Sequence, residues 1–255
     1  MISIPQQSQR HLKTKFTMQK LLCSLLALTL LAAAASRAFA ADANTLTDAE
    51  KSAGWKLLFD GKSLAGWTNF KKTTPPEKGW GIRDGWLHHV AKGGGGDLVS
   101  VDKFSEFELS WEWIISEGGN SGLKYFISDE RKGGAVGHEY QMLDDDKHPD
   151  GKKGLNRQTA AFYDVLEPAN RPVKKPGEIN QSRVLVQGMK VEHWLNGAKV
   201  LEYELGSDAL KAAIAKSKFK TTEAFGTRLP GRILLQDHGD EVSFRSVKIR
   251  ELGGK

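Results

Sequence analysis

From Gly54 onward, hydrophobic and polar residues alternate along the chain with a period of two. In the clearest run, EFELSWEWIIS (106–116), Glu and Ser fill one set of alternate positions up to residue 112, while large hydrophobic residues fill the other set: Phe107, Leu109, Trp111, Trp113 and Ile115. Successive side chains of a β-strand point to opposite faces. The run therefore predicts a strand with one buried face and one polar face.

Turn signals separate further short runs of the same kind. Asp84-Gly85 and Asn196-Gly197 each lie between two alternating runs, and both dipeptides are typical of two-residue β-hairpin turns. The segment 231–252 is interpreted as two final strands joined by a tight turn at Gly239-Asp240. We expect about ten to twelve short strands with turns roughly every 8–12 residues, which is the spacing of a β-sandwich or barrel.

One helix is expected over residues 207–219, capped by Ser207 or Asp208. The chain shows no internal repeat, no low-complexity tract and no domain linker. The simplest organisation is a single all-β domain over residues 50–252, built as a sandwich of two antiparallel sheets with one short helix.

Residues 1–40 have the features of a secretory signal peptide. The basic N-terminal region ends at Lys20, an apolar run follows over 21–35, and Ala38-Phe39-Ala40 matches an A-x-A cleavage site. The alternative is a single membrane anchor, for which the apolar run is short. We therefore expect a periplasmic or secreted protein that begins at Ala41 and has no membrane span after cleavage.

Removing this leader changes what the net charge means. The full chain carries a formal charge of +6, but the leader holds five basic residues and no acidic ones. The remaining 32 basic residues nearly balance 31 acidic residues, so no nucleic-acid partner is expected. The only cysteine, Cys23, also lies in the leader. The mature protein is therefore expected to lack disulfides and cysteine metal sites.

Polar residues occupy one face of a predicted strand at HEYQML (138–143). Glu139 and Gln141 point one way, whereas His138, Tyr140 and Met142 point the other way. Asp144 would join Glu139 if a bulge or the strand end brought it to the same face. We expect Glu139, Gln141 and Asp144 to converge on a concave sheet, although the alternative is an ordinary solvent-facing strand. The amide between the two acids departs from a two-carboxylate glycosidase.

Six more residues are candidates for a binding or catalytic site. They are polar or aromatic side chains near strand ends or on polar strand faces, namely Asn120, Lys124, Tyr163, Trp194, Gln236 and His238. Trp194 alternates with polar residues and could stack on a sugar. The alternatives are ordinary: turn residues, solvated strand positions and half-buried aromatics. The histidines His88, His89 and His148 are interpreted as surface residues.

Five motifs in order along the chain give a resemblance to a known family. They are GWKLLFDGKSLAGW (54–67), GGNSGLKYF (118–126), HEYQMLDDD (138–146), VEHWLNGAKVLEYE (191–204) and ILLQDHGDEVSFRSVKIREL (233–252). Together they resemble the bacterial 3-keto-disaccharide hydrolases over nearly the whole mature chain. Two positions depart from the family pattern: Ile179 replaces a Trp, and Ala160 replaces a Gly.

The resemblance implies a concanavalin-A-like jelly-roll sandwich, export, and action on glycosides whose C3 hydroxyl a partner dehydrogenase has oxidised. A 3-ketone makes the C2 proton acidic, so a base can remove it. The enolate then expels the C1 substituent, and water adds back.

Such a route needs a base, a donor to the enolate oxygen and an acid for the leaving group. We expect Glu139 or His238 as the base, with Asp144 orienting its neighbours. Tyr163 or His238 would serve the leaving group. The side chains expected to hold the ketone oxygen and the ring hydroxyls are Asn120, Lys124 and Gln141.

Two alternatives remain open from the sequence. No cofactor is required, but a divalent metal held by Glu139, Asp144 and His238 could polarise the ketone instead. The competing class of protein is a non-catalytic carbohydrate-binding module that uses Trp194 and other aromatic residues as a platform. Convergence of carboxylate and histidine would favour the enzyme, and an open aromatic face would favour the binding module.

Overall fold

The structure is a computed structural model that describes residues 42–131 and 134–253. The predicted signal peptide, residues 1–40, lies outside the described residues. The chain from Ala43 to Lys255 forms one compact unit. Within the described ranges, no helix has both the length and the apolar character needed to cross a membrane.

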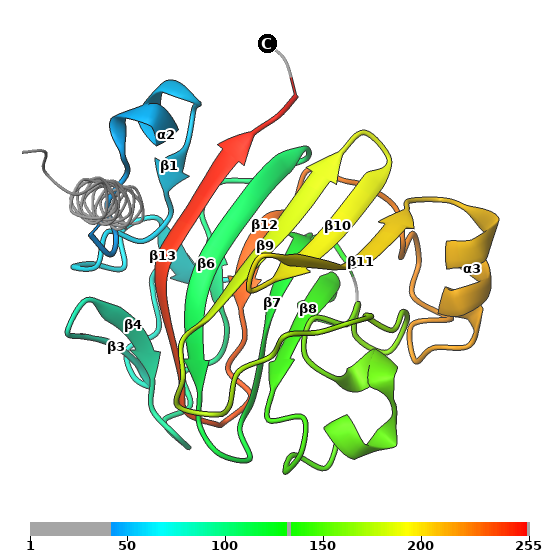
Figure 1. Cartoon of the computed structure of the whole chain (residues 1–255). Coiled ribbons are helices and arrows are strands. Elements are labelled where there is room, and N and C mark those ends of the chain that lie inside the picture. The colour runs from blue at the N-terminus through cyan, green and yellow to red at the C-terminus, as the bar shows by residue number, and fades with distance from the viewer. Residues whose placement is uncertain (1–41, 132–133, 254–255) are drawn as a thin grey trace, which may run out of the picture. The chain divides into compact units, whose positions relative to one another are not determined.

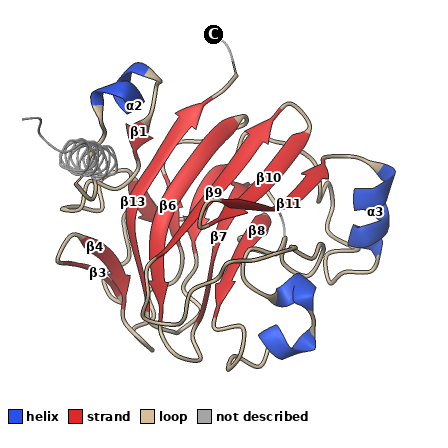
Figure 2. Ribbon diagram, in the orientation of Figure 1, coloured by secondary structure: helices blue, strands red, loops and turns tan. Residues whose placement is uncertain are grey.

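The compact unit consists of two antiparallel sheets packed face to face (Figures 1 and 2). The eight-stranded sheet has the order β11-β10-β9-β6-β13-β4-β3, with β1 also paired to β13. The five-stranded sheet has the order β2-β5-β12-β7-β8. The predicted all-β sandwich of two antiparallel sheets is confirmed.

The strands are short, as the turn spacing predicts. Their bounds are β1 Lys56–Leu57, β2 Trp67–Asn69, β3 Trp80–Arg83, β4 Trp86–His89, β5 Leu98–Ser100, β6 Phe107–Ile115, β7 Asn120–Ile127, β8 His138–Leu143, β9 Asn180–Gln187, β10 Lys190–Leu195, β11 Ala198–Glu204, β12 Arg232–Leu235 and β13 Val242–Glu251.

Strand β6 shows how the alternating pattern produces the sandwich. Its large hydrophobic residues are buried between the sheets, where the Trp111 ring lies 5.0 Å from the ring of Tyr140 on β8. Its acidic residues lie on the opposite face, where Glu108 pairs with Arg183 at 2.6 Å and Arg250 at 2.5 Å. Burial of the apolar face stabilises the fold, since each fully buried large side chain contributes about 1.5–3 kcal/mol.

Both predicted hairpin turns are confirmed. Asp84 and Gly85 connect β3 to β4 with φ values of 51° and 76°. Asn196 and Gly197 connect β10 to β11 with φ values of 47° and 85°. Positive φ at both central positions is what a two-residue turn needs to match the twist of its strands, and Asn, Asp and Gly tolerate it best.

The predicted tight turn between the last two strands is wrong. Strand β12 belongs to the five-stranded sheet and β13 to the eight-stranded sheet, so the segment 236–241 crosses from one sheet to the other. Sequence alternation identifies strands, but it does not say which sheet each strand joins. We call residues 236–241 the crossing segment.

The predicted helix is confirmed as α3, Asp208–Ala215, with the Ser207 side chain accepting the Leu210 N–H as the cap. It ends earlier than expected because the Ser217 hydroxyl bonds the Ile214 carbonyl at 2.8 Å, and the chain turns there. A second helix, α2 (Asp48–Ser52), begins at a Thr47/Glu50 capping box that the sequence analysis did not use. Two 3-10 turns complete the described helices, Gly151–Lys153 and Leu155–Arg157.

A chain of histidine and tyrosine side chains is buried between the sheets. His193 Nδ1 lies 2.9 Å from the Ala160 carbonyl, which can only accept, so Nδ1 donates and Nε2 accepts from Tyr125 at 2.8 Å. Tyr125 then accepts from Tyr203 at 2.7 Å, and Tyr203 accepts from His138 Nδ1 at 2.9 Å. Burial lowers the pKa of His138 to about 3 and that of His193 to about 4, so both rings are neutral.

Candidate active site on the outer face of the five-stranded sheet

Glu139 and Lys124 lie side by side on the face of the five-stranded sheet that points away from the core. They are direct partners across β8 and β7, and the Lys124 Nζ is 3.5 Å from Glu139 Oε2. Their strand neighbours Tyr140 and Leu123 are fully buried in the core, so alternation places Glu139 and Lys124 on the outer face. Glu139 is only 5% exposed, which shows that surrounding segments cover this face.

A glycine makes room for the Glu139 carboxylate. Gly122 precedes Lys124 by two residues on β7 and therefore lies on the same face of the strand. It pairs with Gln141 on β8. A Cβ atom at residue 122 would lie 2.8 Å from Glu139 Oε1 and 3.1 Å from its Cγ. The absence of a side chain at Gly122 therefore fixes where the carboxylate sits.

Asp97, the residue before β5, adds another carboxylate to the charged side chains near Lys124. The Asp97 Oδ1 accepts the backbone N–H of Asp237 at 2.9 Å. Burial raises the pKa of Asp97, and the nearby charges of Asp237 and Glu139 raise it further, whereas the Lys124 ammonium and the Asp237 N–H lower it. The ammonium of Lys124 thus interacts with the carboxylates of both Glu139 and Asp97.

A loop beside β8 carries Tyr163 to the same face. The backbone N–H groups of Ala160 and Tyr163 donate to the carbonyls of Gln141 at 2.8 Å and Glu139 at 3.1 Å. Phe162 points into the core and stacks on His138, so its neighbour Tyr163 points outward. The structure therefore brings Tyr163, a residue predicted for the site, to the outer face that carries Glu139 and Lys124. We call these three side chains the Glu139 patch.

The Tyr163 hydroxyl is already engaged. It donates to Asp150 Oδ2 at 2.5 Å and accepts from Arg157 at 3.2 Å. Burial and the hydrogen bond to Asp150 raise the pKa of Tyr163 well above its ordinary value. Tyr163 is therefore a neutral, oriented side chain rather than a free proton donor, which differs from the role predicted for it.

Lys218 adds a second ammonium to this region. Its Nζ lies 4.1 Å from the centre of the Tyr163 ring, and its backbone N–H donates to Asp164 at 2.7 Å. Although much of the residue is exposed, partial burial of its ammonium lowers the pKa of Lys218, and the charge of Glu139 opposes that shift.

Asn120 and His238 meet at the other end of β7. The Asn120 Nδ2 is 3.4 Å from His238 Nε2, and the Asn120 backbone N–H donates to Asp240 Oδ2 at 2.9 Å. Gln236 lies at the start of the crossing segment and donates its backbone N–H to the Gly122 carbonyl at 3.0 Å. The structure therefore brings Asn120, Gln236 and His238 to the same strand as Lys124.

Gln141 shares the outer face with Glu139, as predicted, but part of its hydrogen-bonding capacity is used locally. Its Oε1 accepts the backbone N–H of Met142 at 3.0 Å, and the side chain is almost fully buried. Gln141 therefore supports the strand from which Glu139 projects.

The Asp144 carboxylate bonds the backbone of two loops. Its carboxylate accepts backbone N–H groups of Gly118 at 2.8 Å and of Asp146 and Lys147 at 3.1 Å. These hydrogen bonds lower the pKa of Asp144, although burial opposes them. A carboxylate that follows a strand and accepts these N–H groups holds the turn after β8 and the loop before β7 together.

Trp194 lies on the other sheet. It belongs to β10, donates to Glu192 at 2.8 Å, and is covered by the Arg183 guanidinium 4.0 Å above its ring. The sequence correctly placed it on a polar strand face, but that face is the outer face of the eight-stranded sheet. Trp194 is thus no platform beside Glu139.

Several residues of this region escaped the sequence analysis. Asp97, Asp150, Arg157 and Lys218 lie outside the five motifs, and Asp240, which lies within the last motif, was considered only as a turn residue. The interpretation of three histidines as surface residues is wrong. His88 and His89 on β4 are 7% and 0% exposed, and His89 contacts Asp237 Oδ1 at 3.1 Å. His148 is half-buried beside His238.

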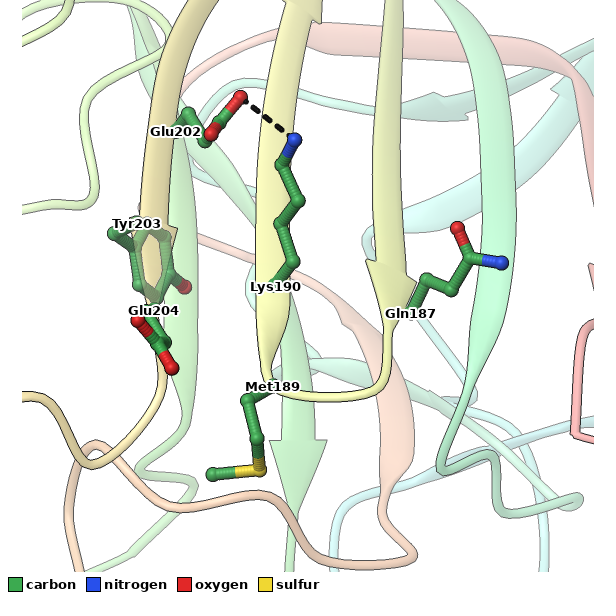
Figure 3. Close-up of a pocket in the computed structure, with 6 residues that line it drawn as sticks. All are labelled: Gln187, Met189, Lys190, Glu202, Tyr203 and Glu204. Carbon is green, nitrogen blue, oxygen red and sulfur yellow. Dashed lines mark ion pairs between the residues drawn. The ribbon is translucent and has the colours of Figure 1, made fainter.

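A pocket of about 480 Å³ lies elsewhere, at one end of β10 and β11 (Figure 3). It is lined by Gln187, Met189, Lys190, Glu202, Tyr203 and Glu204. None of these residues belongs to the Glu139 face, and Lys190 is paired with Glu202 at 3.1 Å. This pocket therefore has no part in the candidate site.

Solved structures define the class of protein. A protein of Parabacteroides distasonis, provisionally described as a glycosyl hydrolase, matches with a TM-score of 0.76 and 35% identity, over 83% of this chain and 100% of that chain. A second protein of the same organism and description matches with a TM-score of 0.61 and 27% identity, over 78% and 99%. Fold and site together define a β-sandwich hydrolase.

Sequence comparison then identifies the family. Residues 54–250 match the family described as the 3-keto-alpha-glucoside-1,2-lyase-like domain. A 3-keto-disaccharide hydrolase of Bacteroides thetaiotaomicron is 37% identical over 229 residues, which cover 78% of this chain and 79% of that protein. The chain belongs to this family, as the five sequence motifs indicate.

Proposed function

We propose that this protein cleaves glycosides whose C3 hydroxyl has been oxidised to a ketone, and that Glu139 is the base that removes the C2 proton. The observation that carries this proposal is the Glu139–Lys124 pair, a nearly buried carboxylate 3.5 Å from an ammonium on the outer face of the five-stranded sheet. This pair puts a proton acceptor and a cation next to each other, which is what enolate formation needs.

The first step transfers the C2 proton to Glu139. The electron pair of the C2–H bond becomes the enolate, whose negative charge develops on the C3 oxygen. Lys124 is the nearest cation to Glu139 and stabilises that oxygen. The enolate then re-forms the ketone and expels the substituent at C1, giving an unsaturated 3-keto sugar and the released alcohol after protonation of the leaving oxygen.

The second step adds water across the new double bond. The family description names a lyase, whereas the Bacteroides relative is called a hydrolase. Elimination followed by hydration accounts for both names. The first step is a lyase reaction, and the sum of the two steps is hydrolysis. The Lys218 ammonium lies over the Tyr163 ring, interacts electrostatically with Glu139 and has a lowered pKa, so it would serve as the proton donor to the leaving oxygen.

This substrate class implies a supplier and a location. A sugar oxidised at C3 must come from an oxidoreductase that removes hydride from the C3 carbon, and we propose such an enzyme as the functional partner. We also propose that the chain is exported and acts in the periplasm or outside the cell, as residues 1–40 predict. N-terminal sequencing of the exported protein should begin at Ala41, and an uncleaved cytoplasmic protein would exclude export.

The test is the substitution Glu139→Gln, assayed on a 3-keto-glucoside beside its unoxidised parent. Loss of a general base typically costs about 10²–10⁴-fold in rate. The matched control is Glu192→Gln, since Glu192 is also nearly buried (7%) and paired with lysines, but lies on the other sheet. Glu192→Gln should retain turnover. Wild-type activity in Glu139→Gln would remove Glu139 from the mechanism.

A further inference from the structure

A pocket lies on the outer face of the eight-stranded sheet, over strands β6, β9 and β10. Figure 1 shows these three strands side by side, in front of β7 and β8 of the other sheet. The pocket has a volume of about 260 Å³ and is lined by Ser110, Gln181, Ser182, Arg183, Trp194 and Gly197. We call it the Trp194 pocket. It faces away from the core on the opposite side of the sandwich from Glu139.

The floor of the Trp194 pocket is low because a small residue stands between two long ones. Ser110 on β6 pairs with Arg183 on β9 and with Lys248 on β13. Both long side chains turn toward carboxylates: Arg183 donates to Glu108 at 2.6 Å. Lys248 donates to Glu50 of α2. The sheet therefore keeps a depression at Ser110 that neither cation fills.

Trp194 forms a wall of the pocket that is fixed before any ligand binds. Its Nε1 donates to Glu192 at 2.8 Å, and the Arg183 guanidinium lies 4.0 Å over its ring. The pairing of β10 with β11 shifts register between His193 and Trp194, and such irregularities re-aim a side chain. The indole thus has one orientation, and part of it stays exposed to solvent.

The hydrogen-bonding groups that remain free in the pocket are uncharged. Among the residues that the structure describes, the Ser110 hydroxyl and the Gln181 side-chain amide make no hydrogen bond. Each of them can both donate and accept. The one charged side chain of the lining, Arg183, is already paired with Glu108. The pocket therefore offers donors and acceptors side by side without a free charge, which matches the hydroxyl groups of a neutral sugar.

We propose that the Trp194 pocket binds one neutral sugar ring of an unoxidised oligosaccharide. The C–H face of the ring packs against the indole of Trp194, and its hydroxyls bond the Ser110 hydroxyl and the Gln181 amide. The volume is below the about 300–1,000 Å³ of pockets for drug-sized ligands, so it suits a single ring.

This binding is independent of the proposed cleavage. The pocket lining contains no carboxylate and no histidine that could act as a base, so a sugar is held there without reaction. It also does not require a ketone at C3. Because the pocket and Glu139 lie on the two outer faces of the sandwich, both can be occupied at the same time. The protein would then hold a glycan on one face while the other face acts on oxidised sugars.

The experiment is a titration of the purified protein with maltotetraose, cellotetraose and tetragalacturonate, followed through the tryptophan indole N–H signals in proton–nitrogen correlation spectra. The Trp194 signal is identified by its loss in Trp194→Phe. We expect it to shift in a saturable way with at least one of the two neutral sugars. No shift of this signal with either neutral sugar would overturn the proposal, and so would a response to tetragalacturonate alone.

Variants test whether the sugar lies in this pocket. Trp194→Ala should weaken binding at least about tenfold, as loss of a central aromatic contact does. Gln181→Ala, an exposed position where folding is not at stake, should weaken it about two- to tenfold through one lost hydrogen bond. The matched control is Trp86→Ala, because Trp86 also lies beneath an arginine, Arg245 at 4.3 Å, but does not line the pocket.

The control variant should bind the sugar with wild-type affinity. Wild-type affinity in both Trp194→Ala and Gln181→Ala would place the sugar elsewhere and overturn the proposal. Glu139→Gln should lose turnover of a 3-keto-glucoside and keep the sugar-dependent shift of the Trp194 signal. The proposed function and the sugar site therefore fail separately.

Discussion

At the scale of single residues, the position of Glu139 depends on what is missing at Gly122. A Cβ there would meet the far end of the Glu139 side chain rather than any backbone atom. The carboxylate can move aside at little cost to the fold, but it then leaves the place beside Lys124 from which it would act. Stability and activity should therefore respond differently to a methyl group at this position.

We expect Gly122→Ala to lower kcat/KM on a 3-keto-glucoside by about 100-fold, because a displacement of about 1 Å at a reacting group costs that much. Its free energy of unfolding, measured in urea, should change by no more than about 1–2 kcal/mol. Gly81→Ala on β3 is the control, since a Cβ at Gly81 would meet nothing within 4 Å. Equal activity of the two variants would contradict the role given to Gly122.

At the scale of elements, the crossing segment decides the shape of one end of the site. It leaves the five-stranded sheet after β12 and enters the eight-stranded sheet at β13. Because β12 and β13 do not pair with each other, pairing between them cannot hold the segment in place. Instead, the Asp237 carboxylate holds it through two backbone N–H groups and the buried His89. The Lys92 N–H adds a bond to the Gly239 carbonyl at 2.7 Å.

Asp237→Ala should therefore destabilise the protein by about 2–4 kcal/mol, because two backbone N–H groups lose their acceptor and the buried His89 loses its carboxylate partner. Asp129→Ala removes a partly exposed pair with Arg232 and should cost no more than about 1 kcal/mol. Urea unfolding of both variants is the measurement, and similar losses would show that Asp237 is no special anchor.

At the scale of the whole molecule, the buried histidines make stability depend on pH. His138 and His193 bind protons at about pH 6.5 in the unfolded chain, but only at about 3 and 4 in the folded protein. Their folded pKa values are depressed, so the unfolded state takes up more protons as the pH falls. The stabilisation that depends on these two neutral histidines is therefore present above pH 6.5 and is lost progressively as the pH falls below it. Asp97, with its raised pKa, has the opposite sign.

We expect the free energy of unfolding to fall by about 2–4 kcal/mol between pH 7 and pH 5, as each buried histidine contributes up to about 1.4 kcal/mol per pH unit. His138→Gln should reduce this slope by about one proton even if the variant is less stable at every pH. The check is a set of urea unfolding curves from pH 5 to 7.5. A slope unchanged by the substitution would exclude His138 as its source.

The sequence by itself determined the strands, both hairpins, helix α3 and the family, because these depend on residues close together in the chain. Period-two alternation fixes which side of a strand is apolar, and Asn-Gly or Asp-Gly fixes a turn. It also placed Glu139 and Gln141 on one strand face. The positive φ of Ala160, 68°, is a backbone conformation that favours glycine, and it became visible only in the structure.

Only the tertiary structure decided which strand faces share a sheet and which loops come together. Trp194 and Glu139 both lie on polar strand faces, but those faces belong to opposite sides of the sandwich. His148, His238 and Asp240 meet because β12 and β13 join different sheets. Alternation assigns a side chain to one of two faces, but long-range packing chooses the partner strand, and no local pattern in the sequence records that choice.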